Sequence, residues 1–229
     1  MTVTGATTLH IPDPDDRGDL GTFVGRVVRL DPTAVVRLRA TETGRVTAWA
    51  STPFDVLATR SVLGSLEPAD VTTFATALLS ALSVDRSDAV DPGTGGLWQG
   101  LLPPEEGWDS VDAVPAAELE GLTERGLALA REHAGPMGPP TSLLDQTVLT
   151  VSGSAVPVAG RTVPAGRGTT GPPVRIPLRC LFALSGMGFV GAGEPGESVL
   201  VSATSSWLRL DARYGAVVRR RITALPLLT

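Results

Sequence analysis

Four carboxylates surround one tryptophan near the middle of the chain. They are Glu105, Glu106, Asp109 and Asp112, and the aromatic residue is Trp108. Two carboxylates beside an aromatic ring can hydrolyse a glycosidic bond, one as the general acid and the other as the base or nucleophile. The same residues also describe a polar loop anchored by one aromatic side chain. We favour the loop, because "LPPEEG" (102–107) has the Pro and Gly of an irregular connection; a hydrolase remains an alternative.

The chain has few residues that bind metals or attack carbonyl groups. Its two histidines, His10 and His133, are far apart in the sequence, and Cys180 is the single cysteine. No pair of these residues has the spacing of a zinc site, and no G-x-S-x-G elbow occurs. Cys180 lies in an apolar stretch, which is typical of an inert buried thiol. We therefore predict no catalytic residue, no cofactor and no metal.

Two short motifs resemble ligand loops but lack residues that such loops need. "DPDDRGD" (13–19) spaces aspartates and a glycine as a calcium loop does, yet Arg17 and Val24 occupy two of its ligand positions. "GAGEPG" (191–196) fits G-x-G-x-x-G, but we expect a helix before it and a strand after it, the reverse of a dinucleotide site. The chain contains no lysine, so a phosphate-loop lysine and a Schiff-base nucleophile are both excluded.

The segment "SSWLRLDARYGAVVRRR" (205–221) predicts two strands around a turn, ending in three arginines. Its candidate contacts for a nucleic acid or another anion are Arg213, Arg219, Arg220 and Arg221. Together with a helix over 177–188, this is the layout of a winged-helix module. That helix is almost wholly apolar, so we expect it to be buried rather than to read a groove. Arginines at a sheet edge also prevent unwanted strand pairing, so nucleic-acid binding is the second hypothesis.

Hydrophobic patterns predict the elements that position these residues in the first half of the chain. A strand-like segment at 21–30 precedes an antiparallel meander over 34–40, 45–50 and 54–62, with a turn at "TETG" (41–44). A helix beginning at Pro68 covers the apolar face of the meander. Its apolar residues recur at helical spacing: Val71, Phe74, Ala75, Leu78, Leu79 and Leu82.

The second half predicts more helix. A helix runs from Pro115 to about His133, with Leu119, Leu122 and Leu129 inward, and a short helix at "TSLLDQ" leads to a strand at 147–152. A short strand ("VRI") and a helix over 177–189 follow. A terminal meander then uses 198–203, 207–211 and 216–221. This meander weakly echoes the first one in sequence, and we favour coincidence over duplication.

Composition indicates a globular chain with an uneven charge. Hydrophobic residues make up 42% and charged residues 19% of the 229 positions. No apolar run approaches the roughly 20 residues of a membrane span, and Met1–Leu9 lacks the features of a signal peptide, so we expect a cytoplasmic protein. Residues 1–114 hold 8 Arg against 16 Asp and Glu, whereas residues 115–229 hold 11 Arg against 8. Such asymmetry is typical of an anionic partner or of two halves that attract each other.

These patterns predict an α+β protein with two modules, each a small antiparallel β-meander packed with one or two helices. We expect a flexible acidic leader over 1–20, an N-terminal module over 21–110 and a C-terminal module over 111–229. The last of these includes a Gly- and Pro-rich loop at 153–173.

Four stretches carry a family resemblance: "VRLDPTAVVRLR", "PFDVLATRSV", "PLRCLFALSGMGF" and "WLRLDARYGAVVRRR". They resemble an uncharacterised family of actinobacterial cytoplasmic proteins, over about residues 24 to 221. None of these stretches is a catalytic signature. The resemblance implies a two-part architecture and no assigned activity.

The sequence thus favours a non-catalytic binding or regulatory protein over an enzyme. Its expected partner is another protein, with nucleic acid as the alternative and no membrane. The motivation is a well-patterned globular chain in which no catalytic constellation is complete.

Overall fold

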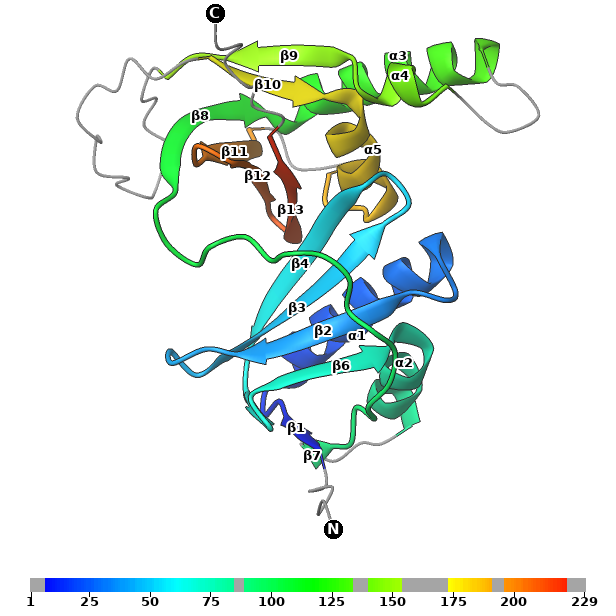
Figure 1. Ribbon diagram of the computed structural model, residues 1–229, viewed down its shortest axis with the longest axis vertical. Helices are drawn as coiled ribbons and strands as arrows, with labels where there is room; N and C mark the ends of the chain where they lie inside the picture. Colours follow the sequence, from blue (N-terminus) through cyan, green and yellow to red (C-terminus); the bar gives the residue numbers. More distant parts are fainter. Residues whose placement is uncertain (1–6, 85–88, 134–139, 154–172, 191–195, 222–229) are drawn as a thin grey trace, which may run out of the picture. The chain divides into compact units, whose positions relative to one another are not determined.

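The computed structural model describes residues 7–84, 89–133, 140–153, 173–190 and 196–221. The chain forms two compact units, unit 1 (Met1–Leu101) and unit 2 (Leu102–Thr229) (Figure 1). Each unit combines an antiparallel sheet with helices, which confirms the predicted α+β class. The expected boundary at 110/111 falls inside strand β8 (Asp109–Pro115), which belongs wholly to unit 2. The Gly- and Pro-rich loop lies almost entirely outside the described residues.

Unit 1 opens with a long helix where we predicted a flexible leader followed by a strand. Helix α1 spans Pro14–Leu30, and Asp13 caps it by accepting a hydrogen bond from the backbone N–H of Asp15 at 2.8 Å. Proline at its first position also favours the start of a helix. The buried residues follow helical spacing: Leu20, Phe23, Val24 and Val27. Both predictions for this segment were wrong, because glycines at 18, 21 and 25 hid that stripe.

The charged residues of the predicted leader hold unit 1 together. Arg17 donates from Nη2 to the carbonyl of Leu82 at 3.2 Å, near the last turn of α2 (Ala75–Val84). Asp19 forms an ion pair with Arg60 on β4. These contacts join α1 to α2 and to the sheet, so charge density at the N-terminus reflects packing rather than solvation.

The main sheet of unit 1 follows the predicted meander. Strands β2 (Val35–Ala40), β3 (Arg45–Thr52) and β4 (Val56–Leu63) pair antiparallel, and β6 (Asp70–Phe74) adds beside β2 to give the order β6-β2-β3-β4. Gly44 has a φ of 70° in the predicted β2–β3 turn. A smaller sheet has the order β5-β1-β7, from Ser65–Glu67, Thr8–His10 and Ala89–Val90.

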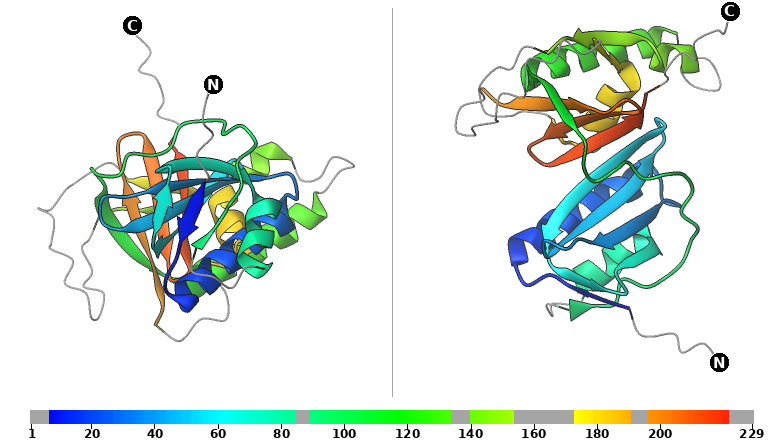
Figure 2. Two further views of the ribbon diagram at one scale, coloured as in Figure 1. Left: turned by 90° about the horizontal axis from the view of Figure 1, so that it is seen from below. Right: turned by 60° about the vertical axis from the view of Figure 1, so that its left-hand side comes forward.

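The segment predicted as one helix from Pro68 forms a strand in its first half and a helix in its second half. Residues 70–74 form β6, and α2 begins only at Ala75. Val71 and Thr73 are buried with a period of two, whereas Ala75, Leu78 and Leu82 are buried with helical spacing. The strand and helix patterns follow each other without a gap. Apolar residues of both segments therefore matched the spacing of one helix, and the prediction placed a single helix over them. Both α1 and α2 lie on one face of the main sheet (Figures 1 and 2).

Unit 2 contains a four-stranded sheet, a two-stranded ribbon and three helices among its described residues. The sheet has the antiparallel order β8-β11-β12-β13, where the last three strands are Ser198–Ala203, Trp207–Ala212 and Gly215–Arg220. The ribbon pairs β9 (Thr147–Val151) with β10 (Val174–Pro177). The helices are α3 (Ala116–Glu132), α4 (Thr141–Leu144) and α5 (Leu178–Gly186).

Helix α3 has the predicted bounds but a different buried face. Leu119 is buried as expected, whereas Leu122 is half-buried and Leu129 is exposed. Small residues complete the buried stripe, chiefly Gly126 and Ala130. A Cβ atom at Gly126 would collide with the Leu178 side chain of α5, so the glycine sets how closely the two helices approach.

The two main sheets have matching plans in a different chain order. In unit 1, a helix leads into the meander β2-β3-β4, and the edge strand β6 with its helix α2 comes afterwards. In unit 2, the edge strand β8 with its helix α3 comes first, and α5 leads into β11-β12-β13. The sequence echo therefore falls on strands that occupy corresponding places. Within the described ranges, no helix is long and apolar enough to cross a membrane.

Candidate functional site

The arginine-bearing hairpin of unit 2 is formed by β12 and β13. Trp207 lies opposite Arg220, and Leu208 lies opposite Arg219. Residues directly opposite each other share a face of the sheet, so Arg219 belongs with the buried Leu208, on the face that packs on α5. Arg220 projects from the other face. The hairpin therefore does not present its arginines as one patch.

Arg219 is part of an internal ion cluster. It donates from Nη2 to Asp145 Oδ1 at 3.2 Å and is only 13% exposed. Arg179 of α5, nearly buried itself, reaches the same oxygen from Nη2 at 2.7 Å. One half-exposed carboxylate thus binds two guanidinium groups and joins α4, α5 and β13. This role explains the position of Arg219 without an external ligand.

The other three candidate arginines differ in their contacts and in the exposure of their side chains. Arg221 donates from Nη1 to the carbonyl of Thr204 at 2.8 Å and so fixes the β11–β12 turn. Arg220 stacks at 5.8 Å over the ring of Trp207, and Arg213 at 5.5 Å over the ring of Tyr214. Arg213 and Arg220 are the exposed pair. Any external anion contact at this hairpin falls to these two residues.

Helix α5 is buried, as its composition predicted. All seven residues from Leu178 to Leu184 are inaccessible to solvent or nearly so, Cys180 among them. A recognition helix must expose several polar side chains to a groove. The winged-helix reading of this segment is therefore wrong, because α5 forms the core of unit 2 and cannot enter DNA.

The carboxylates near Trp108 are arranged as a polar loop. The indole N–H of Trp108 donates to the carbonyl of Pro104 at 3.0 Å, and Arg209 stacks over its ring at 5.9 Å. Asp112 accepts a hydrogen bond from the next backbone N–H through Oδ1 at 2.8 Å. Glu105, Glu106 and Asp109 are exposed to solvent. In the described parts of the chain, no group of three or more His, Cys, Asp or Glu residues could hold a metal.

Both histidines make contacts with the backbone of unit 1 or unit 2. His10 lies in β1 and pairs with Ser65, so it is not in a mobile leader as predicted. His133 follows α3, and its Nδ1 lies 3.0 Å from the carbonyl of Leu129.

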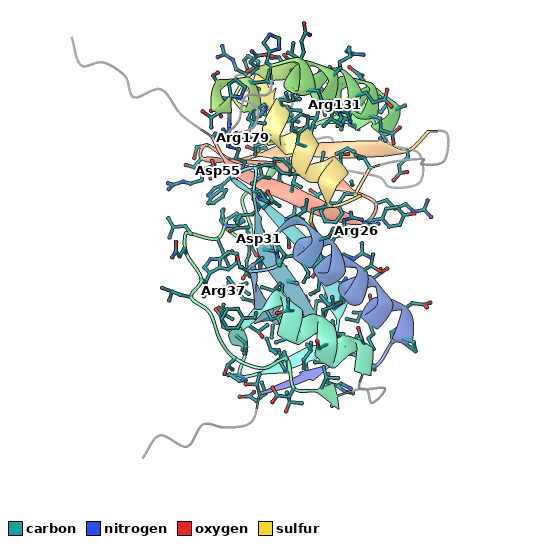
Figure 3. All side chains as sticks on the ribbon, turned by 90° about the vertical axis from the view of Figure 1, so that its right-hand side faces the viewer. Arg26, Asp31, Arg37, Asp55, Arg131 and Arg179 are labelled. Atoms are coloured by element: carbon teal, nitrogen blue, oxygen red, sulfur yellow. The ribbon has the colours of Figure 1, made fainter. Side chains whose placement is uncertain are left out.

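A second polar surface, at the edge of the unit 1 sheet, had no signal in the local sequence patterns. Asp70 on β6 accepts two hydrogen bonds from Arg37 on β2, at 2.8 and 2.7 Å, and Arg39 lies 3.4 Å away. Figure 3 shows Arg37 on the face of the sheet opposite α1 and α2. The hydrogen bonds from Arg37 lower the pKa of Asp70, and the same pair raises the pKa of Arg37. Residues separated by 33 positions meet here only through strand pairing.

This ion pair predicts an acid-dependent stability difference. Because the folded pKa of Asp70 is lowered, its contribution is complete above the unfolded pKa near 4 and is lost as pH falls through the folded value. We expect Asp70→Asn to lower the free energy of unfolding at pH 7 by at most about 1 kcal/mol, since the pair is solvent-exposed. Urea unfolding at pH 7 and below pH 3 measures this, with Glu42→Gln as the control. An equal difference at both pH values would contradict it.

Helices α1, α2 and α3 carry no excess of positive charge, and the one Arg of the buried α5 pairs with Asp145. Helix α1 has three Asp and three Arg, α2 has no charged residue, and α3 has four Glu against two Arg. Duplex binding depends on several Lys or Arg side chains that neutralise phosphates. The helical faces of both units therefore provide a poor surface for nucleic acid.

The fold is similar to that of bacterial DNA polymerase sliding clamps. Caulobacter crescentus pol III beta matches with a TM-score of 0.54 and 17% identity, over 96% of this chain and 66% of that one. The Pseudomonas aeruginosa clamp with ligand matches with 0.55 and 11%, over 95% and 66%. The Bacillus subtilis clamp matches with 0.52 and 13%, over 96% and 65%. The chain thus spans about two thirds of the length of these clamps, and the likeness establishes the two-domain α+β fold alone.

Family models match both units. Residues 4–99 match a domain of unknown function (DUF8010), and residues 103–224 match another domain of unknown function (DUF8185). No curated protein matches the chain. Because the second match takes in more than half of the 229 residues, the chain belongs to the DUF8185 family, with a DUF8010 match over unit 1.

Proposed function

We propose that this chain is a non-catalytic binding protein, a sliding-clamp-like scaffold whose partner is another protein. The observation that carries the proposal is the clamp-like fold over almost the whole chain. The matched proteins are named as DNA polymerase sliding clamps, which implies that proteins with this fold act together with a polymerase. All 19 Lys and Arg positions are arginine and the chain has no asparagine, a residue usage typical of high-GC genomes that supports an actinobacterial origin. We also propose a cytoplasmic location.

The distribution of charge supports a protein partner over nucleic acid. The chain carries a net charge of −5, and its exposed helices have no positive excess. Arg219 and Arg221 both make internal contacts. The carboxylates near Trp108 form a loop anchored by stacking and one hydrogen bond.

Affinity capture followed by reconstitution tests the proposal. The purified full chain is immobilised, proteins retained from an extract of the source organism are identified, and each complex is rebuilt from purified components. We expect one stoichiometric complex that calorimetry measures with a Kd in the micromolar range or tighter. Failure of every rebuilt complex, or a chemical turnover that one point mutation abolishes, would contradict the proposal.

Nucleic-acid binding through Arg213 and Arg220 is the second candidate. It is favoured by two exposed arginines that are already held over aromatic rings. If it is correct, a fluorescent duplex or single strand binds at 50 mM salt and loses affinity at 200 mM. Replacing both residues by Ala then flattens the salt dependence by about two phosphate contacts.

Fluorescence anisotropy on both probes makes this measurement. The matched control is Arg125→Ala/Arg131→Ala, which removes two exposed arginines from α3. Absence of binding at 50 mM salt, or an equal loss in the control, removes nucleic acid as a partner of this hairpin.

A further inference from the structure

Strand β6 is the outer strand of the main sheet of unit 1, and its backbone groups alternate in direction. Ala69 and Ala75 flank β6 and form backbone hydrogen bonds at the two ends of β2, from Ala40 N to Ala69 O at 2.8 Å and from Ala75 N to Ala34 O at 2.9 Å. In an antiparallel register every second pair is hydrogen-bonded, so the N–H and C=O groups of Asp70, Thr72 and Phe74 point away from β2. These groups form a sheet edge of the kind to which another strand can add.

A segment of unit 1 covers this edge. We call residues 91–101 the strap. Gly95 donates its backbone N–H to the carbonyl of Thr72 at 3.0 Å, and the hydroxyl of Thr73 donates to the carbonyl of Pro92 at 2.6 Å. In Figure 3 the strap runs as a green trace on the same side of the sheet as Arg37. Within the described residues, Gly95 supplies the strap's one main-chain hydrogen bond to β6.

Two glycines allow the strap to lie against the sheet. A Cβ atom at Gly95 would stand 2.8 Å from the ring of Phe74, and one at Gly96 would collide with the side chain of Val35. Gly96 also has a φ of 77°, which other residues rarely adopt. The backbone of the strap therefore approaches the sheet closely at Gly95 and Gly96. On either side of these glycines, Pro92 is buried and Trp98 is half-buried.

Apolar side chains remain exposed on the strap and beneath it. Leu97 is 77% exposed, Leu101 is 67% exposed and Phe74 is 48% exposed. Phe74 lies against Gly95 and Gly96, directly before Leu97 in the strap. Exposed apolar groups that lie together mark interaction surfaces. The strap thus pairs with the edge through one main-chain hydrogen bond and leaves Phe74 and Leu97 exposed beside it.

We propose that the β6 edge is a docking site for an extended apolar segment of a partner protein, which adds to β6 as a strand after displacing the strap. This inference rests on the proposed function as a protein-binding scaffold. The incoming backbone engages the outward groups of Asp70, Thr72 and Phe74, where the strap engages Thr72. Its apolar side chains cover Phe74 and Val35.

Charge defines one end of the occupant. Two guanidinium groups, from Arg37 and Arg39, share the single carboxylate of Asp70 at the start of β6. Both guanidinium groups therefore lie at this end of the edge. A carboxylate on the incoming segment, opposite Asp70, would lie beside these guanidinium groups, which are complementary to it in charge.

Four variants distinguish the effect of opening the strap from the effect of removing a hydrogen-bonding group of the β6 edge. Gly95→Ala opens the strap by a clash with Phe74, and Thr73→Val opens it by removing the hydrogen bond to Pro92 without a clash. Thr72→Pro removes an outward N–H and leaves the β2 ladder intact, because proline is tolerated on the free side of an edge strand. Gly21→Ala on α1 is the control, since nothing lies within 4 Å of its new Cβ.

The probe is a phage-displayed library of 12-residue peptides, selected on the full-length Gly95→Ala protein. Fluorescence anisotropy then measures the selected peptides on all variants, and unfolding midpoints confirm that each variant is folded. We expect apolar peptides with an acidic residue to bind both open variants about tenfold more tightly than wild type and Gly21→Ala. Thr72→Pro should weaken binding at least tenfold.

The inference is overturned if no peptide is selected, if Thr72→Pro binds as well as wild type, or if strap opening leaves affinity unchanged. Thr73→Val decides the last point if Gly95→Ala does not fold. A failure here leaves the capture experiment with the whole chain untouched, so loss of this docking site and loss of the proposed function give different results.

Discussion

Replacing Asp145 by alanine should lower the free energy of unfolding by about 3 kcal/mol. This carboxylate accepts hydrogen bonds from the nearly buried Arg179 and from Arg219, at 2.7 and 3.2 Å. Removing one partner of a buried pair costs about 3–5 kcal/mol, because the remaining charge stays out of water. Asp145 is itself 45% exposed, so the lower end of that range applies. Urea unfolding followed by circular dichroism measures the change.

Two further variants identify the cause of that loss. Asp145→Asn keeps one acceptor oxygen, so it should retain part of the stability. Arg219→Ala keeps the contact between Asp145 and Arg179 and should cost less than Asp145→Ala. A loss below about 0.5 kcal/mol for Asp145→Ala would mean that the cluster does not hold α4, α5 and β13 together.

Replacing Gly126 by valine should destabilise the protein by about 3 kcal/mol. A Cβ atom at this position collides with Leu178, which is buried in α5 and cannot move into solvent. Overpacking of this kind costs about 1–3 kcal/mol, and the two methyl groups of valine put the cost at the upper end. Gly126→Ala should show a smaller loss, since the better helix propensity of alanine offsets up to about 1 kcal/mol.

Gly121 on the same helix provides the matched control. Its new Cβ would meet only the end of the flexible Arg125 side chain, at 3.5 Å. Gly121→Ala should therefore be neutral or stabilise by up to about 1 kcal/mol. If both glycines gave the same result on thermal unfolding, close packing of α3 on α5 would not be the reason for Gly126.

The meanders could be predicted because their patterns are local. In β2, the buried Val36 and Leu38 alternate with Arg37 and Arg39, and Gly44 marks the turn that follows. In unit 2, alternation is seen at the start of β11, whereas β12 and β13 contain consecutive buried residues and were predicted as strands on either side of a turn. Such two-residue periods, bounded by turns, need no information from distant parts of the chain.

Helix α1 escaped prediction because its signals were interpreted separately. Asp13 and Pro14 mark a helix start, and the buried stripe follows from Leu20, but Gly18 and Gly21 divide the two signals. Acidic density then suggested a solvated leader. Only the structure reveals that Asp19 pairs with Arg60, 41 residues away.

The environments of the hairpin arginines and of the strap also depend on contacts between residues that are far apart in the sequence. Arg219, Arg220 and Arg221 are adjacent in the sequence, yet the alternation of a strand and the position of Asp145 give each a different environment. The strap had no sequence signal beyond a glycine-rich stretch, "DPGTGG". Its place against Phe74 and Val35 follows from strand pairing that local patterns do not encode.

We expect the chain to bind its protein partner through the β6 edge rather than through the hairpin of unit 2, and one comparison tests this most directly. The complex rebuilt from purified components is measured by calorimetry with wild type, Thr72→Pro and Arg213→Ala/Arg220→Ala. We expect an unchanged Kd for the arginine variant and at least tenfold weaker binding for Thr72→Pro. Unchanged binding by Thr72→Pro with loss in the arginine variant would contradict it and move the binding surface to the hairpin of unit 2.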